Sequence, residues 1–168
     1  AEELMDNAGR VAADRIIELE EQGHFGLGPS YVILAGKGNN GGDGLVVATR
    51  LHARGRSVRV VVIGHRAEGC GVLEARLGNV PKEIRIDRSE TSSNINQFFD
   101  NEVIIDSVLG SGVTRPVEGE LAVLFAEVNA SGRPVVAIDL PSGTMDPSER
   151  LGTGPMIQAH HTITFQVP

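Results

Sequence analysis

The chain has 168 residues, carries a formal net charge of −7 and contains a single cysteine. This length is enough for one domain with a sizeable core, and the acidic balance argues against a nucleic-acid partner. One cysteine excludes an intramolecular disulfide and a cysteine-based zinc site. A lone thiol also fits a reducing compartment, so we expect a cytoplasmic protein.

No stretch reaches the ~20 consecutive apolar residues that a membrane helix needs, so we expect neither a signal peptide nor a membrane partner. The chain begins at Ala1 rather than Met and ends at Pro168, directly after a strand-like run. We therefore expect residues 1–168 to form a single domain that is trimmed at both ends.

The first predicted element is an amphipathic helix over residues 1–21, which we interpret as a packing helix. Its apolar residues lie on or near one face: Leu4, Ala8, Val11, Ala12, Ile16, Ile17 and Leu19. A connector over residues 22–30, rich in Gly, follows.

Residues 31–50 are the stretch around which the chain is organised. The apolar run over 31–35 predicts a strand buried on both faces of a parallel sheet. A glycine-rich turn over 36–44 comes next, and a helix is predicted over 42–53. Glycines let backbone N–H groups approach a phosphate, and the positive end of the following helix points at the same place.

The glycine-rich turn has two interpretations. Gly36, Gly38 and Gly41 satisfy G-x-G-x-x-G, a permissive dinucleotide fingerprint. A second strand is predicted over 58–63, but no acidic residue follows it to bind ribose hydroxyls. Arg66 lies there instead, which weakens a simple dehydrogenase interpretation and leaves a cation for a 2′-phosphate.

The remaining elements alternate between strand and helix. We predict short helices over 73–77 and 92–99, strands over 84–86, 102–106, 135–139 and 161–167, and a helix over 118–130. This alternation predicts an α/β protein: a three-layer α/β/α Rossmann-like domain with a mainly parallel sheet.

Three loops at one edge of this sheet carry polar side chains beside glycines. The first has Asn39, Asn40 and Asp43; the second begins at Asp106 and the third contains Asp139 and Ser142. A lone Asp at a strand end is more often a helix cap than a catalyst, but three such loops favour one convergent site. Oxygen ligands of this kind suit a hard cation better than zinc.

At these residues the sequence resembles the YjeF N-terminal domain family, whose members are NAD(P)H-hydrate epimerases. Three motifs carry the resemblance: residues 38–44, residues 105–120 and residues 137–143. The likeness extends from a first-helix motif at 4–9 to residues 162–165 and so covers nearly the whole chain. The family's chain usually continues past the final strand, beyond the point where this sequence stops.

The resemblance implies an isomerase of metabolite repair that interconverts the R and S epimers of hydrated NADH and NADPH (NADHX and NADPHX). A partner dehydratase, possibly fused at the C-terminus in the full-length protein, would then restore NAD(P)H from the S epimer. The resemblance also implies a homodimer with one potassium ion per subunit. By the family's pattern, potassium would be bound by Asn40, Asp106 and Ser142. The substrate would be bound by Asn39, Asn40, Gly41, Gly42, Asp43, Gly110, Ser111, Gly112, Val113, Thr114, Arg115, Pro116 and Asp139.

Epimerisation breaks and remakes a bond at a ring carbon that bears oxygen and sits next to nitrogen. We expect a carboxyl group to carry the proton, with Asp106 as first candidate and Asp43 as second. Against Asp106, a carboxylate beside a cation is a poorer acid. Two alternatives remain open: a non-catalytic nucleotide-, RNA- or protein-binding module of the same fold, and an NADP-dependent oxidoreductase that uses the glycine turn and Arg66.

Overall fold

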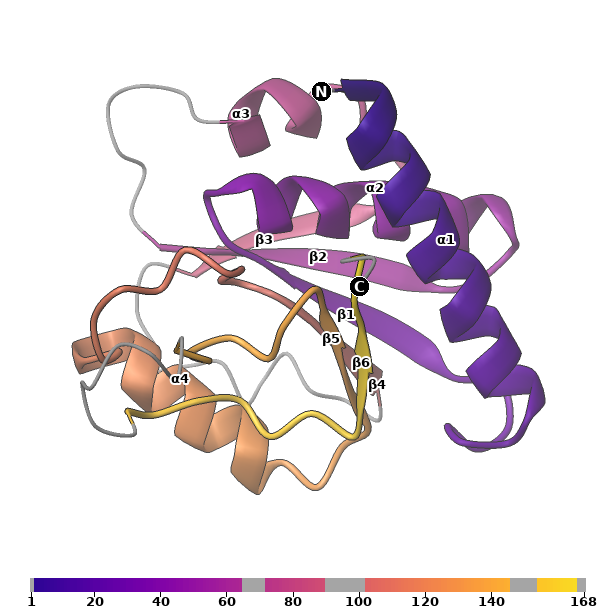
Figure 1. Ribbon diagram of the computed structural model, residues 1–168. Helices are drawn as coiled ribbons and strands as arrows, with labels where there is room; N and C mark the ends of the chain where they lie inside the picture. The colour runs from indigo at the N-terminus through magenta and orange to yellow at the C-terminus, as the bar shows by residue number, and fades with distance from the viewer. Residues whose placement is uncertain (1, 65–71, 90–101, 146–153, 166–168) are drawn as a thin grey trace.

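The computed structural model describes residues 2–64, 72–89, 102–145 and 154–165. Within these ranges, six parallel strands form one sheet in the order β3-β2-β1-β4-β5-β6 (Figure 1). The strands are β1 (Ser30–Ala35), β2 (Val58–Ile63), β3 (Arg85–Ser89), β4 (Glu102–Ser107), β5 (Val135–Ile138) and β6 (His161–Ile163). The helices are α1 (Glu2–Glu21), α2 (Asn39–Ala53), α3 (Val72–Leu77) and α4 (Gly119–Ala130). The predicted α/β class and parallel sheet are confirmed.

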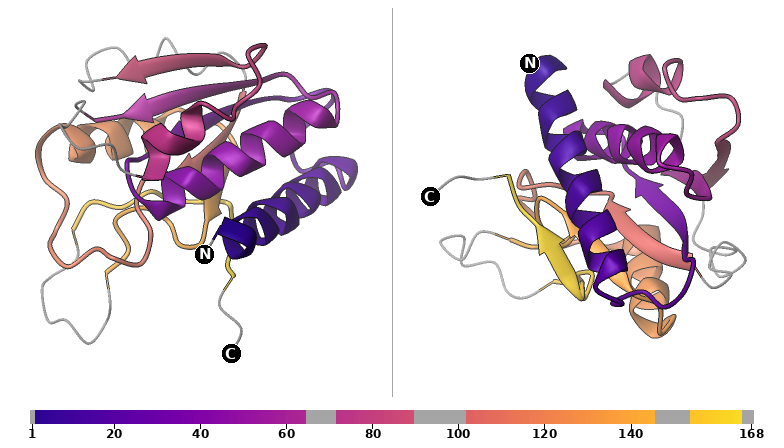
Figure 2. Two further views of the ribbon diagram at one scale, coloured as in Figure 1. Left: turned by 90° about the horizontal axis from the view of Figure 1, so that it is seen from above. Right: turned by 90° about the vertical axis from the view of Figure 1, so that its right-hand side faces the viewer.

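Helices cover both faces of the sheet, so there are two separate cores. Figures 1 and 2 show α1, α2 and α3 on one face and α4 on the other. Alternate residues of β1 divide between them: Tyr31 and Ile33 pack towards α1 and α2, whereas Val32 and Leu34 pack towards α4. A strand buried on both faces is expected to be a continuous apolar run, which is how β1 was recognised.

The helix after the glycine turn starts earlier than predicted. α2 begins at Asn39, not at Gly42, so Asn39 and Asn40 belong to its first turn. The helix can start there because its glycines lie against backbone. A Cβ on Gly41 would overlap the carbonyl oxygen of Gly36, and one on Gly44 would overlap the Ser107 hydroxyl. These glycines therefore let α2 lie directly on β1 and β4.

Other boundaries also differ from the prediction. The strand expected over 84–86 is β3, shifted towards the carboxyl end, because this edge strand exposes polar residues that give no apolar run. β6 stops at Ile163, since it pairs only with β5 and β5 ends at Ile138. Val11, predicted on the packing face of α1, is 48% exposed. The helix expected over 92–99, and the side chain of Leu4, lie outside the described residues and side chains.

In the described ranges, none of the helices combines the length and apolar character that a bilayer crossing requires.

The close approach of α2 to the strands predicts unequal losses of stability when Gly41 and Gly38 are replaced. Gly41→Ala should lower the free energy of unfolding by at least about 3 kcal/mol, because the added methyl meets the backbone of Gly36. Gly38→Ala is the matched control: φ is −86° and nothing lies within 4 Å of the added carbon, so the loss should stay below about 1 kcal/mol. Urea unfolding of both variants measures the difference, and equal losses would contradict this account of the helix start.

A candidate active site at the carboxyl edge of the sheet

The carboxyl ends of β1 to β5 open into a cleft of about 1480 Å³. Its walls are the turns after these strands: residues 36–40 with Asp43, Ile63 and Gly64, Ser89, residues 108–118, and Asp139. Part of α4, including Glu120, Leu121 and Leu124, closes one side. The strand order reverses between β1 and β4, and the crevice at such a reversal is where open α/β sheets bind ligands.

Most of the predicted site residues reach this cleft. Asn39, Asn40, Asp43, residues 110–116 and Asp139 all line it. Gly41 and Gly42 do not, because they are buried where α2 packs on the strands. Asp106 and Ser142 also lie beneath the surface rather than on the cleft wall, at 0% and 1% exposure.

Asp106 ties the end of β4 to the turn after β5. Its Oδ2 accepts a hydrogen bond from the Ser142 backbone N–H at 2.8 Å, and its Oδ1 accepts from the Ser142 hydroxyl at 2.5 Å. The Val108 N–H donates to Oδ1 at 3.2 Å. Burial raises the pKa of Asp106 to about 6, and the hydrogen bonds from Ser142 and Val108 oppose that rise.

The backbone of one residue, Leu109, joins all three polar loops. The Leu109 N–H donates to Ser142 Oγ at 2.8 Å, and the Leu109 carbonyl accepts from Asn40 Nδ2 at 2.9 Å. The first turn of α2, the loop after β4 and the turn after β5 are thereby held together. Sequence reasoning missed Leu109, since its contribution comes from backbone atoms that carry no residue-specific signal.

A cation would satisfy an oxygen atom that the protein leaves unpaired. Asn40 is 7% exposed, and its Oδ1 is buried with no hydrogen-bond partner among the described residues. Near it lie the Asp106 carboxylate and the Ser142 hydroxyl, connected through Leu109. No cluster of three or more His, Cys, Asp and Glu that could hold a metal occurs in the described part of the chain. The donors available are thus amide, hydroxyl and carboxylate oxygens, the ligands of hard cations.

Asp43 and Asp139 are the aspartates that line the cleft, and Glu118 and Glu120 line it as well. Asp43 has a buried Oδ1 without a partner in the described structure, and burial raises its pKa to about 6. Arg76 on α3 opposes this shift, and the charge of Asp139 adds to it. Asp139 directly follows β5 and has a φ of 69°, which is uncommon for a residue with a side chain. A carboxyl group with a pKa of about 6 can both give and take a proton near neutral pH.

Sequence reasoning missed several residues of the cleft wall. Lys37, between two glycines of the first turn, lines the cleft, as do Gly64 and Ser89 at the ends of β2 and β3. Lys37 was detectable as the one cation inside the glycine turn. Ser89 was not detectable, because the sequence predicted that this strand ends at residue 86, whereas β3 extends to Ser89. Arg66, the predicted cation for a 2′-phosphate, lies outside the described residues.

The chain was compared with known protein families and curated proteins. It matches the family described as YjeF-related protein N-terminus over residues 1–168. It is 35% identical to the NAD(P)H-hydrate epimerase of Limosilactobacillus fermentum, covering 96% of this chain and 73% of the relative. It is 32% identical to the NAD(P)H-hydrate epimerase of Rhodopirellula baltica, covering 98% and 65% respectively.

Other relatives are much longer than the matched region. The bifunctional NAD(P)H-hydrate repair enzyme Nnr of Thermofilum pendens is 33% identical over 98% of this chain, which spans 31% of that protein. Among solved structures, the yeast protein ynu0 (YNL200c) superimposes with a TM-score of 0.79 at 23% identity, covering 99% of this chain and 71% of the yeast chain. That structural likeness supports the fold.

The raised pKa of Asp43 predicts a pH-dependent gain in stability on removing its charge. The pKa rises from 3.8 unfolded to about 6 folded, so ionisation destabilises the folded state fully above about pH 6 and not below about pH 4. Asp43→Asn should therefore raise the melting temperature at neutral pH, with the gain disappearing between about pH 6 and pH 4. Asp14→Asn, which removes an ion pair between α1 and Arg54 at the C-terminal end of α2, is the control and should show no such gain. A gain from Asp43→Asn that is the same at every pH would contradict the assignment.

Proposed function

This chain belongs to the YjeF-related N-terminal family, and on that premise we propose that it is an NAD(P)H-hydrate epimerase. The reaction interconverts the R and S epimers of NADH and NADPH that carry a hydroxyl group on the nicotinamide ring. The observation that carries the proposal is a carboxyl group with a pKa of about 6, Asp43, on the wall of a cleft at the strand-order reversal. Such a place suits proton transfer to a bound dinucleotide.

The cleft has the size and chemistry for this substrate. Its volume of about 1480 Å³ exceeds the range of roughly 300–1,000 Å³ typical of small-molecule pockets, as a whole dinucleotide requires. The N-terminus of α2 opens onto it at Gly38, and the first helical turn offers backbone N–H groups to a phosphate. The guanidinium group of Arg115 and the hydroxyls of Ser111 and Thr114 also line the cleft.

Asp43 is the group that we assign to proton transfer. Protonated Asp43 donates to the ring hydroxyl; the C–O bond breaks with help from the nitrogen lone pair, and water leaves. Water then attacks the same carbon from the other face, and its proton passes, directly or through Asp139, to the Asp43 carboxylate left by the first step. No oxidant or reductant is consumed, and the proton balance closes over the cycle.

Asp106, the first candidate from the sequence, is better suited to a positioning role. It is 0% exposed, and Ser142 and Val108 already donate three hydrogen bonds to it. A group sealed in this way has no path to the substrate. Its contacts hold Ser142 and, through Leu109, Asn40 in place below the cleft.

We further propose that potassium binds beside Asn40, Asp106 and Ser142. The unpaired Asn40 Oδ1 supports this assignment, because a buried amide oxygen without a partner costs free energy that a cation would recover. Bound potassium would supply positive charge that favours the ionised form of Asp106. Asn40 on α2 and Ser142 after β5 would then be joined by a common ligand as well as through Leu109.

The partner reaction follows from the chemistry of the product. A hydrated dinucleotide is useful only once water is removed, so a dehydratase that takes the S epimer is the functional partner. Relatives named bifunctional repair enzymes extend far beyond the region matched by this chain, which supports a second activity in their remaining length. The homodimer and the cytoplasmic location stay predictions.

Epimerisation can be measured directly by supplying R-NADPH hydrate with a dehydratase that consumes only the S epimer. We expect this protein to accelerate NADPH recovery, and Asp43→Asn to slow its contribution by about 100-fold or more, the usual scale of acid–base catalysis. Asp14→Asn, on α1 and away from the cleft wall, should retain activity. A folded protein without any effect would reject the epimerase and favour the binding module. Hydride transfer from unmodified NADPH would favour the oxidoreductase.

Potassium binding has a readout that does not depend on activity. Replacing choline chloride by potassium chloride at equal ionic strength should raise the melting temperature, because potassium binds only the folded site. Asn40→Ala should abolish the increment, whereas Asn39→Ala, at an exposed neighbouring position, should preserve it. Equal increments in all three proteins would show that potassium acts elsewhere.

A further inference from the structure

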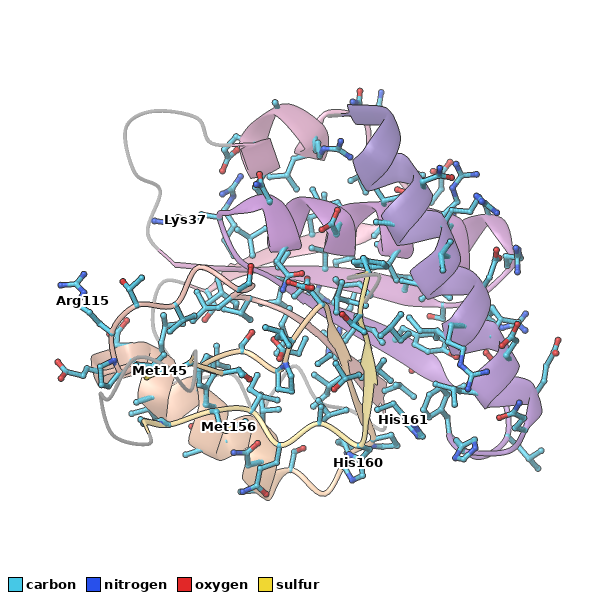
Figure 3. The ribbon with its side chains drawn as sticks, viewed as in Figure 1. Lys37, Arg115, Met145, Met156, His160 and His161 are labelled. Atoms are coloured by element: carbon cyan, nitrogen blue, oxygen red, sulfur yellow. The ribbon has the colours of Figure 1, made fainter. Side chains whose placement is uncertain are left out.

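Lys37 is a cation on the cleft wall that the proposed mechanism does not use. It follows Gly36 at the end of β1 and is exposed. Figure 3 shows its side chain extending from the start of α2 towards the side of the molecule where Arg115 also projects. Among the described residues, no hydrogen-bond or ion-pair partner occupies its ammonium group.

The Lys37 side chain lies over the end of β2. A Cβ placed on Gly64 would be 3.1 Å from Lys37 Cε and 3.6 Å from Nζ. Gly64 has a φ of 102° and donates its N–H to the Ser89 carbonyl at 3.1 Å, so its backbone donor is already used. The ammonium group therefore supplies a positive charge directly beside the end of β2.

The strand order sets the direction of a bound dinucleotide. In sheets with the order 3-2-1-4-5-6, the dinucleotide crosses the reversal between β1 and β4, and its adenosine ribose lies at the end of β2. Asp139 lies on the other side, directly after β5, and Asp43 on α2 is close enough for the two charges to interact. The reacting nicotinamide ring must lie by those carboxyl groups, which leaves the ribose of adenosine beside Gly64 and Lys37.

The chemistry at the end of β2 distinguishes the two dinucleotides. Sites for the unphosphorylated form place an acidic residue there to bind the ribose hydroxyls, and a 2′-phosphate would be repelled by it. Here β2 is followed by Gly64, which has no side chain, and the nearest described charge is the ammonium of Lys37. We propose that Lys37 binds the 2′-phosphate of hydrated NADPH and makes the enzyme prefer it over hydrated NADH. This inference rests on the proposed function and adds a specificity-determining residue to it.

Steady-state kinetics with both substrates tests the proposal. The wild type, Lys37→Gln and Lys82→Gln are each assayed with R-NADPH hydrate and R-NADH hydrate, in the presence of excess S-specific dehydratase. Lys82 is the other lysine of the chain and does not line the cleft, so it gives a matched loss of charge. Lys37→Arg, which keeps the charge, is the conservative variant, and melting temperatures confirm folding.

We expect Lys37→Gln to raise the KM for hydrated NADPH by about tenfold with kcat unchanged, the loss typical of a charge-assisted hydrogen bond. The KM for hydrated NADH should change by less than about twofold, since the lost contact is specific to the 2′-phosphate. Lys82→Gln should change neither KM value. Lys37→Arg should retain most of the wild-type preference for hydrated NADPH over hydrated NADH. An equal rise of KM for both substrates would place Lys37 on a phosphate that they share, and no change in either would remove it from the site; both results overturn the proposal.

Failure of the proposed function has a separate signature, because the wild type would then accelerate neither reaction. In that case calorimetric titration with 2′-phospho-ADP-ribose and with ADP-ribose still decides the role of Lys37. A weaker affinity of Lys37→Gln for the phosphorylated compound alone supports the assignment, and equal affinities of the variant and wild type reject it.

Discussion

The buried contact between Asp106 and Ser142 is the constraint on which the cleft depends. It joins the end of β4 to the turn after β5, and the Leu109 peptide extends the connection to Asn40 on α2. Asp106 is 0% exposed, so ionising its carboxyl group costs free energy, and this cost raises its pKa to about 6. The three hydrogen bonds that it accepts offset part of this cost and hold the loop after β4 against the turn after β5.

The carboxyl edge of the sheet combines closely packed glycines with polar groups that lack favourable contacts. Gly41 and Gly44 allow α2 to contact backbone and side chain of the strands, a rigid arrangement that positions its N-terminus. Asp43 and Asp139, in contrast, are held near one another with little compensation: Asp43 has an unpaired buried oxygen and Asp139 a left-handed backbone. Strain and uncompensated charge of this kind gather at functional sites, where a substrate or ion can relieve them.

The charged side chains at the two ends of the cleft have different proposed functions. Carboxyl groups stand at the end next to β5, where bond breaking needs a proton carrier, and the ammonium of Lys37 stands at the end next to β2. The glycine-rich turn after β1 carries both Lys37 and Asp43, and the start of α2 provides backbone N–H groups. The arrangement fits a long substrate with an uncharged reacting ring at one end and phosphate at the other.

The sequence by itself determined the fold class, the limits of β2, and the set of polar loops that meet at one edge, because long apolar runs and strand-end polar residues are local signals. It also determined that Asn40, Asp43 and Asp139 would lie together, since carboxyl ends of parallel strands share an edge. Only the tertiary structure decided that Asp106 is sealed while Asp43 faces the cleft, as burial depends on packing between distant segments. It alone placed Lys37 over Gly64, a contact between two turns whose separation in sequence hides their proximity.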